Sequence, residues 1–309
     1  MTPDSASSRV VITGGTGLIG RALSSRLAAS GLDVVVLSRR SPEETRVPRG
    51  CRVVRWDGVS SASWVAEADG ALAIVNLAGE SIAGGRWTKT RQRRIVGSRV
   101  AAADAVVDAV GQARRRPEVV LQASAVGFYG DRGDEPLDES SRAGSGFLAE
   151  TTLAWERATA RVEELGMRRV LLRTGLVLAR DGGALAAMTP PFRFGLGGRL
   201  GDGRQWMPWI HLDDEVGAIV HLLERREARG PFNLCAPEPA TNAAFTRALA
   251  QVLHRPAFCA APAAALRLVL GEMSNLVLGG QRVRPRRLLE SGFSFRFPEL
   301  SGALENLFP

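Results

Sequence analysis

A glycine-rich turn at residues 13–20 restricts most strongly how this chain can fold. The β-branched run at residues 10–13 leads into Gly14, Gly17 and Gly20, and apolar residues then recur at helical spacing. Glycines in this pattern allow a sharp turn, close approach of the backbone to a bound group and tight packing of helix on strand. Because the helix N-terminus also offers free N–H groups, the segment predicts a nucleotide-binding turn. The residues expected to contact the nucleotide are Gly14, Thr16, Gly17, Leu18, Ile19 and Gly20.

Further apolar runs repeat along the first half of the chain. They occupy residues 33–37, 52–55, 71–77, 119–122 and 169–172. Between them lie segments of helical character at residues 62–68, 88–113 and 146–165. The runs are too apolar for an antiparallel sheet with one face in water. Apolar strands that alternate with helices predict an α/β fold, a doubly wound parallel sheet of the Rossmann type buried on both faces.

The composition changes after residue 178, where glycine and proline become frequent. A helical pattern at residues 213–224 and a strand pattern at 232–235 then follow. A chain of 309 residues is long for one core. We therefore expect a nucleotide-binding domain at residues 1–180 with a return at 212–236, and a smaller C-terminal α+β domain from residues 181–211 and 237–309.

Charge and cysteine content exclude several classes of protein. The chain has 40 basic and 32 acidic residues, but the basic ones come in short groups with no tail, which argues against a nucleic-acid partner. Residues 1–8 carry no secretory pattern and no apolar run reaches a membrane span, so we expect a cytoplasmic protein without a membrane partner. Three widely spaced cysteines predict neither a disulfide framework nor a metal site.

The end of the second predicted strand indicates which dinucleotide is bound. It reads Ser38-Arg39-Arg40, and no carboxylate follows until Glu43. An acidic residue there would bind the ribose of NAD, whereas arginine accommodates the 2′-phosphate of NADP. The pattern therefore favours NADP(H), with a solvated pair of arginines as the alternative. Asp57 ends the third strand, where it can accept from the adenine amino group, and the small residues up to Gly79 let the chain run beside the cofactor.

Several motifs resemble the extended short-chain dehydrogenase/reductase superfamily. More narrowly, the chain is similar to its atypical epimerase-family group, which carries a C-terminal domain of unknown function. The similarity covers nearly the whole chain and rests on residues 13–20, 76–80, 86–88, 98–99, 124–130, 155–156, 173–177, 208–211 and 284–300. It implies bound NADP(H), with 2′-phosphate contacts from Ser38 and Arg39. It also implies contacts from Leu77, Ala78, Arg99 and, at the nicotinamide end, Val177.

The chain departs from the superfamily in its catalytic pair. Tyr129 and Lys89 are its only tyrosine and lysine, and their spacing excludes a tyrosine followed four residues later by a lysine. That pair normally provides a general acid or base. What remains near the expected pocket is Ser124, Tyr129, Arg86, Trp206 and His211, of which Ser124, Tyr129 and His211 are the catalytic candidates. For Tyr129 a structural loop role is equally consistent, and for His211 a structural hydrogen bond is the preferred interpretation.

Two functional hypotheses follow. The leading one is an NADP(H)-dependent oxidoreductase or epimerase-like enzyme with an unconventional proton donor, acting on a small molecule such as a carbonyl compound or a sugar nucleotide. The rival is a non-catalytic NADP(H)-binding sensor or interaction protein. The absent tyrosine–lysine pair motivates the rival.

Overall fold

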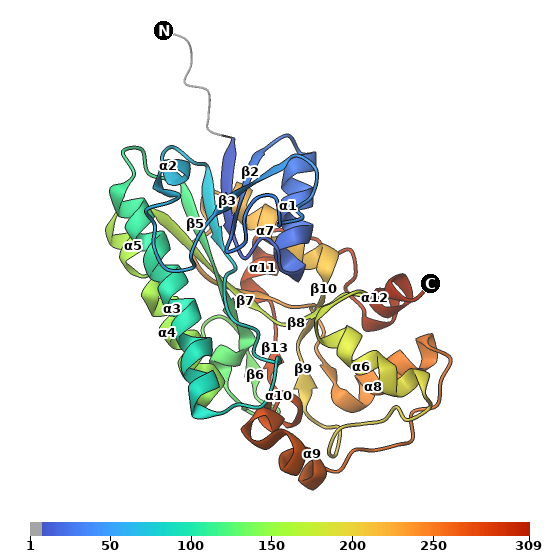
Figure 1. Cartoon of the computed structure of the whole chain (residues 1–309). Coiled ribbons are helices and arrows are strands. Elements are labelled where there is room, and N and C mark those ends of the chain that lie inside the picture. Colours follow the sequence, from blue (N-terminus) through green and yellow to red (C-terminus); the bar gives the residue numbers. More distant parts are fainter. Residues whose placement is uncertain (1–7) are drawn as a thin grey trace.

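The computed structural model describes residues 8–309, and a seven-stranded sheet lies at its centre (Figure 1). The strand order is β11-β7-β5-β4-β1-β2-β3, and every neighbouring pair is parallel. This confirms the α/β fold class expected from the apolar runs. The strands are β1 (Arg9–Thr13), β2 (Asp33–Ser38), β3 (Cys51–Arg55), β4 (Ala73–Asn76), β5 (Val119–Ala125), β7 (Arg168–Thr174) and β11 (Gly230–Leu234).

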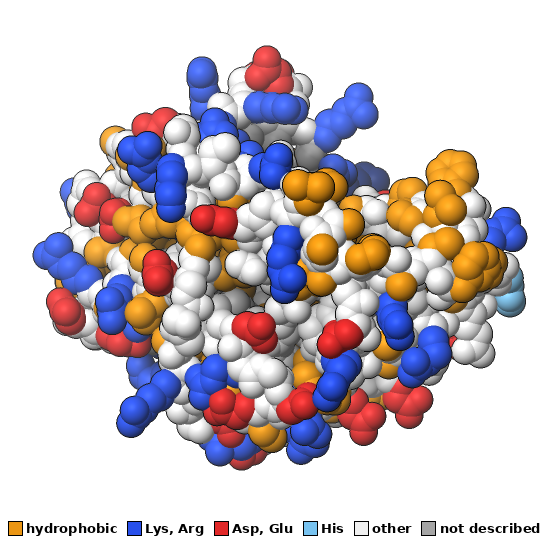
Figure 2. Space-filling model, turned by 90° about the horizontal axis from the view of Figure 1, so that it is seen from below, with side chains coloured by type: hydrophobic (Ala, Val, Ile, Leu, Met, Phe, Trp, Pro, Cys, Tyr) orange, Lys and Arg blue, Asp and Glu red, His pale blue; other side chains and the backbone are white. Residues whose placement is uncertain are grey.

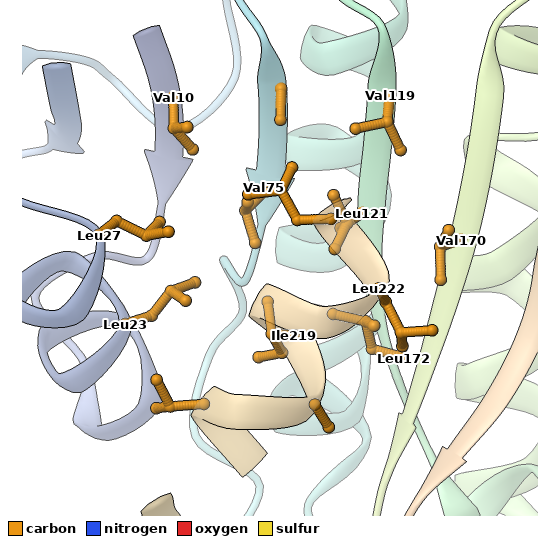
Figure 3. Close-up of a cluster of buried hydrophobic side chains, with 14 of the residues drawn as sticks. Val10, Leu23, Leu27, Val75, Val119, Leu121, Val170, Leu172, Ile219 and Leu222 are labelled. Atoms are coloured by element: carbon orange, nitrogen blue, oxygen red, sulfur yellow. The ribbon is translucent and has the colours of Figure 1, made fainter. Parts of the chain in front are cut away.

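Helices cover both faces of the sheet because successive side chains of a strand point to opposite sides. Val10 and Ile12 pack with α1 (Leu18–Ala29) and α7 (Leu212–Glu224), as Figure 3 shows for Val10 beside Leu23 and Leu27. Val11, between them, belongs to the cluster on the opposite face. That face carries α2 (Val65–Ala68), α3 (Lys89–Gln112), α4 (Phe147–Ala158) and α5 (Arg161–Glu164).

The single helix expected over residues 146–165 is divided into α4 and α5. The break falls at Thr159, which is buried and whose hydroxyl accepts a hydrogen bond from Arg169 Nη1 at 3.2 Å. This side-chain bond ties the end of α4 to β7. The sequence pattern correctly predicts helical structure here, but it does not show that the helix is interrupted between α4 and α5.

The smaller part of the molecule has its own apolar core around Leu185, Phe245 and Leu304. It lies at the lower right of Figure 1. The remaining short strands pair as β8 (Leu176–Leu178) with β10 (Trp209–His211), β9 (Trp206–Met207) with β12 (Ala240–Thr241), and β6 (Pro136–Leu137) with β13 (Arg282–Val283). The remaining helices are η1 (Val126–Tyr129), α6 (Gly183–Arg193), α8 (Asn242–Val252), α9 (Ala263–Leu270), η2 (Gly271–Ser274), α10 (Asn275–Leu278), α11 (Arg286–Glu290) and α12 (Leu300–Leu307).

The chain leaves the large sheet after β7 and returns to it as α7 and β11. We keep the boundaries at residues 1–180, 181–211, 212–236 and 237–309 as a proposal; residues 1–7 lie outside the described part. Within residues 8–309 no helix combines the length and the apolar character that crossing a bilayer requires. The same residues contain no cluster of three histidine, cysteine or acidic side chains suited to a metal ion.

The strand order reverses beside β1, which pairs with β2 on one side and β4 on the other. In parallel α/β sheets, ligands bind in the crevice outside the carboxyl ends of the strands at such a reversal. The fold therefore places the glycine-rich turn at the mouth of this crevice.

Candidate functional site

The turn between β1 and α1 is packed so closely that side chains cannot be added to it. Gly14 has φ +66°, and a Cβ placed on it would lie 2.6 Å from the carbonyl oxygen of Leu77. A Cβ on Gly20 would lie 2.3 Å from the carbonyl oxygen of Gly14. Gly17 precedes α1 and provides no side-chain cap, so the first N–H groups of the helix face the crevice uncapped. The arrangement suits a pyrophosphate.

A cavity of about 270 Å³ opens beside this turn and gathers residues from three parts of the chain. Seven of the predicted cofactor residues line it, namely Gly14, Gly17, Leu18, Ile19, Gly20, Leu77 and Val177. Four further lining residues were not predicted, namely Gly175, Leu176, Gly183 and Ala184. Of these four, Gly175 could have been recognised from the sequence, because it is a glycine that directly follows a strand. A Cβ on Gly175 would lie 2.4 Å from the Pro208 carbonyl oxygen.

A buried row of hydrogen bonds fixes the chain where β1 and β4 end, next to the lining residues Gly14 and Leu77. The Thr13 hydroxyl donates to Asn76 Oδ1 at 2.5 Å, and Asn76 Nδ2 donates to Gln122 Oε1 at 2.8 Å. The same hydroxyl accepts from the backbone N–H of Ala78 at 3.1 Å, which holds the chain just after β4. The row crosses β1, β4 and β5, so it could not be recognised from spacing along the chain.

At the end of β2, Arg39 is exposed and forms no ion pair within residues 8–309. Ser38 is buried, and its hydroxyl accepts from the backbone N–H of Arg40 at 3.2 Å. Ser38 therefore shapes the turn that presents Arg39.

Asp57 follows β3 by two residues, at the carboxyl edge of the sheet, and is exposed. Its Oδ1 accepts from the N–H groups of Ser60 and Val59, both at 2.8 Å, and these bonds lower its pKa. Asp57 holds its own loop, and Oδ2 is the oxygen left for a ligand.

Arg99, on α3, lies behind the predicted cofactor loop. Its Nη1 donates to the carbonyl oxygens of Glu80 at 2.9 Å and Ile95 at 3.0 Å, and its guanidinium stacks on Trp155. A Cβ on Gly79 would lie 3.1 Å from the Arg99 guanidinium carbon, so only a small residue fits there. Burial lowers the pKa of Arg99 to about 10, although the charge of Glu80 opposes the shift. Arg99 thus supports the loop at Gly79.

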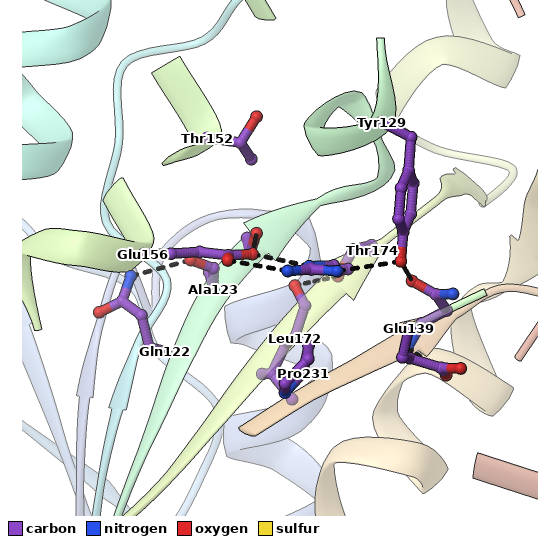
Figure 4. Close-up of polar contacts among 12 residues, drawn as sticks. Gln122, Ala123, Tyr129, Glu139, Thr152, Glu156, Leu172, Thr174 and Pro231 are labelled. Carbon is purple, nitrogen blue, oxygen red and sulfur yellow. Dashed lines mark hydrogen bonds and ion pairs between the residues drawn. The ribbon is translucent and has the colours of Figure 1, made fainter. Parts of the chain in front are cut away.

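The structure gives Tyr129 a different position from the one expected. Its side chain is fully buried, and its hydroxyl donates to Asn233 Oδ1 at 2.7 Å while accepting from Arg173 Nη1 at 3.1 Å (Figure 4). Burial raises its pKa to about 12, with the nearby Arg173 charge acting in the opposite direction. The hydroxyl points into the protein, which is the geometry of the structural alternative, and a contact of Tyr129 with a substrate stays a prediction.

Ser124 and His211 also bind inward. The Ser124 hydroxyl donates to Glu156 Oε1 at 2.6 Å, in the same buried network as Tyr129. His211 is the N-cap of α7, where its Nδ1 accepts from the Asp213 N–H at 3.0 Å, and its ring packs on Phe297. Burial lowers the pKa of His211, although the negative charges of Asp213 and Asp214 act to raise it. For His211 these contacts match the structural hydrogen bond preferred from the sequence, and a catalytic role of either side chain stays a prediction.

The start of α4, where the superfamily pair is expected, is apolar at its surface. Phe147 packs edge to face on Trp87, with ring centroids 4.8 Å apart. The Thr151 hydroxyl donates to the Phe147 carbonyl oxygen at 2.6 Å, and Lys89 is exposed at the start of α3. No other lysine exists in the chain to take the place of the missing one.

Comparison with known proteins agrees with this geometry. A model of the NAD-dependent epimerase/dehydratase family matches residues 10–235, which include the whole glycine turn and β11. The chain belongs to this family. A second model, of a domain of unknown function (DUF1731), matches residues 261–307. The resemblance seen in the sequence motifs is confirmed in both parts.

Individual members of the family are similar over nearly the full length. An epimerase family protein of Staphylococcus saprophyticus is 40% identical over 298 residues, which cover 96% of this chain and 98% of that protein. The crystal structure of the human epimerase family protein SDR39U1 with NADPH has a TM-score of 0.87 at 36% identity and covers 97% of this chain and 98% of its own. A nucleoside-diphosphate sugar epimerase from Corynebacterium glutamicum has a TM-score of 0.77 at 33% identity, covering 99% of this chain and 59% of its own.

Proposed function

We propose that this protein binds NADP(H) in the cavity beside β1 and acts as an oxidoreductase or epimerase-like enzyme on a carbonyl compound or sugar nucleotide. The observation that carries the proposal is the pairing of a side-chain-free turn at Gly14 and Gly17 with the unpaired Arg39 at the tip of β2. When bound, the cofactor supplies or accepts a hydride.

The residues present fit the two charged parts of NADP(H). The uncapped N–H groups after Gly17 suit the pyrophosphate, and the Arg39 guanidinium suits a 2′-phosphate through charge-assisted hydrogen bonds. Val177 and Leu176 offer an apolar wall for the nicotinamide. The human relative was crystallised with NADPH, which supports the same choice of cofactor here.

The substrate class rests on the family. The Corynebacterium glutamicum relative is a nucleoside-diphosphate sugar epimerase, which supports a sugar nucleotide as substrate. Because Ser124 and Tyr129 bind inward, we propose that the proton comes from a group outside the usual pair.

One observation favours a second function, that of a non-catalytic NADP(H)-binding sensor. All three polar candidates for catalysis are buried and hydrogen-bonded inside the protein. In a sensor, the cofactor would bind without turnover and alter the affinity for a partner.

Cofactor binding is tested by titrating the protein with NADPH and NADH while following the fluorescence of its six tryptophans. We expect tighter binding of NADPH, and a loss of about tenfold or more in NADPH affinity alone for Arg39→Ala, since hydrogen bonds to charged groups contribute about 1.5–3 kcal/mol. Arg26→Ala, an exposed arginine at the other end of α1, is the control. Equal affinity for the two nucleotides would reject the preference for NADP(H).

Turnover separates the two functions. With sugar nucleotides and carbonyl compounds as substrates, an enzyme causes loss of NADPH absorbance. Binding of NADPH without oxidation, together with a partner protein whose affinity depends on NADP(H), would favour the sensor.

A further inference from the structure

Large apolar side chains project from one region of the smaller domain. Of the seven exposed large hydrophobic residues among residues 8–309, five lie in this region. They are Phe194 (81% exposed), Leu196 (64%), Phe258 (77%), Leu268 (80%) and Val269 (65%). We call them the apolar tips.

The apolar tips come from two segments that run side by side. The N–H of Cys259 donates to the carbonyl oxygen of Gly197 at 3.0 Å. The N–H of Ala261 donates to the carbonyl oxygen of Arg199 at 2.9 Å. The second segment continues into α9, which has no buried residue although seven of its eight residues are apolar. The tips therefore belong to one continuous surface and not to separate loops.

The two segments that carry the apolar tips are basic, and acidic residues stand only at their ends, namely Asp181, Asp202, Glu238 and Glu272. Residues 182–201 and 239–271 contain no aspartate or glutamate, although the chain has 32 acidic residues in all. They contain five exposed arginines, none of which forms an ion pair within the described part of the chain, namely Arg193, Arg199, Arg247, Arg255 and Arg267. Figure 2 shows orange side chains gathered over the lobe on the right, with blue ones near them and red ones only lower on the lobe.

We infer that this surface docks on anionic phospholipid, with the apolar tips entering the interface and the arginines meeting the headgroups. Exposed aromatic and aliphatic side chains beside arginines are the chemistry that such a surface attracts. The inference goes beyond the proposed function and does not depend on it, and it replaces the expectation that the protein has no membrane partner.

A second copy of the chain fits this surface less well. A twofold dimer brings the same patch of both subunits together, so the five unpaired arginines of each subunit would gather in one interface. Nucleic acid would pair with the arginines but would leave Leu196, Leu268 and Val269 without apolar partners. Lipid satisfies the charge and the apolar tips together.

The test is co-sedimentation with vesicles of phosphatidylcholine alone and of phosphatidylcholine with an equal amount of phosphatidylglycerol. We expect binding to the anionic vesicles only, weakened by salt. The double variants Phe194→Ser/Phe258→Ser and Arg193→Glu/Arg255→Glu should each lose more than about tenfold in vesicle affinity, since each arginine near an anionic surface contributes about fivefold. Thermal unfolding verifies that both variants fold.

Two controls carry the same changes elsewhere on the surface. Leu289→Ser removes an exposed apolar side chain of α11, and Arg161→Glu reverses an exposed charge of α5. Both should bind vesicles as the unmodified protein does. Absence of vesicle binding, or equal binding by the double variants, overturns the inference. Light scattering that shows a dimer dissolved by Phe194→Ser/Phe258→Ser would overturn it in favour of a second copy.

Discussion

Arg173 on β7 and Glu156 on α4 form a two-point ion pair, with Nε–Oε1 at 2.8 Å and Nη2–Oε2 at 3.0 Å. Both side chains are buried. Burial by itself lowers the pKa of Arg173, but the hydrogen bonds and charge of Glu156 outweigh it, so the arginine pKa is raised. Ser124 and Tyr129 bind to this pair from either side, so the pair holds both hydroxyls inside the protein.

Removing one partner of this pair should destabilise the protein strongly. Glu156→Ala leaves a buried guanidinium without its counter-charge, and we expect a loss of about 3–5 kcal/mol in the free energy of unfolding. Glu290→Ala is the control, because both side chains of the Arg286–Glu290 pair are exposed, and it should cost less than about 1 kcal/mol. Urea denaturation measures both, and equal losses would contradict a dominant role of the buried pair.

Tyr129→Phe should change stability and not cofactor binding. The substitution removes the hydroxyl that donates to Asn233, and we expect a loss of about 1–3 kcal/mol with unchanged NADPH affinity. Once a substrate is found, its turnover provides the decisive comparison. If turnover collapses while stability is retained, Tyr129 has a catalytic role after all.

Gly14→Ala should abolish cofactor binding. The new methyl group would meet the Leu77 carbonyl oxygen at a backbone φ of +66°, so the turn must shift away from its present shape. Gly97→Ala is a matched control within α3, because no atom lies within 4 Å of a Cβ added there. It should stabilise the protein by about 0.5–1 kcal/mol. Fluorescence titration with NADPH and thermal unfolding are the measurements; NADPH affinity retained in Gly14→Ala would argue against this cradle.

Glu215 should make stability fall as pH rises. It is buried on α7, with Oε1 accepting from the Thr174 hydroxyl at 2.8 Å and Oε2 unpartnered, and burial raises its pKa to about 8. Between its ordinary value of 4.5 and about 8 the folded state keeps the proton and the unfolded state has lost it. The unfolding free energy therefore declines through this window by a few kcal/mol.

Glu215→Gln should remove that decline, so its stability relative to the unmodified protein increases with pH. Urea denaturation at pH 5 and pH 8 would show this, with Glu224→Gln on the exposed side of α7 as the control. An identical pH slope in Glu215→Gln and the unmodified protein would exclude Glu215 as its source.

The sheet was predictable because its information is local. The runs ending at Thr13 and Leu37 are apolar on both sides, which only a strand between two helical layers requires. The glycines at 14, 17 and 20 lie in one turn, so their spacing alone places them together. Val177 was predicted as a cofactor contact only from the family resemblance, and in the structure it lines the cavity.

The direction of the catalytic candidates was not predictable, since it depends on partners distant in the chain. The Tyr129 hydroxyl binds Asn233, 104 residues away, and the Ser124 hydroxyl binds Glu156, 32 residues away. The sequence shows that Ser124 lies near the end of a strand and that Tyr129 follows it. It does not show that Glu156 and Arg173, from other elements, bind the two hydroxyls inside the protein.

The amino-acid sequence by itself determined the parallel sheet, the glycine turn and the lack of a tyrosine–lysine pair, because strand pattern, turn geometry and residue identity are local properties. Only the tertiary structure decided that Ser124, Tyr129 and His211 form hydrogen bonds inside the protein, and that the apolar tips lie together. Burial and hydrogen-bond partners depend on which distant segments meet, and that is settled when the sheet and the smaller domain pack together.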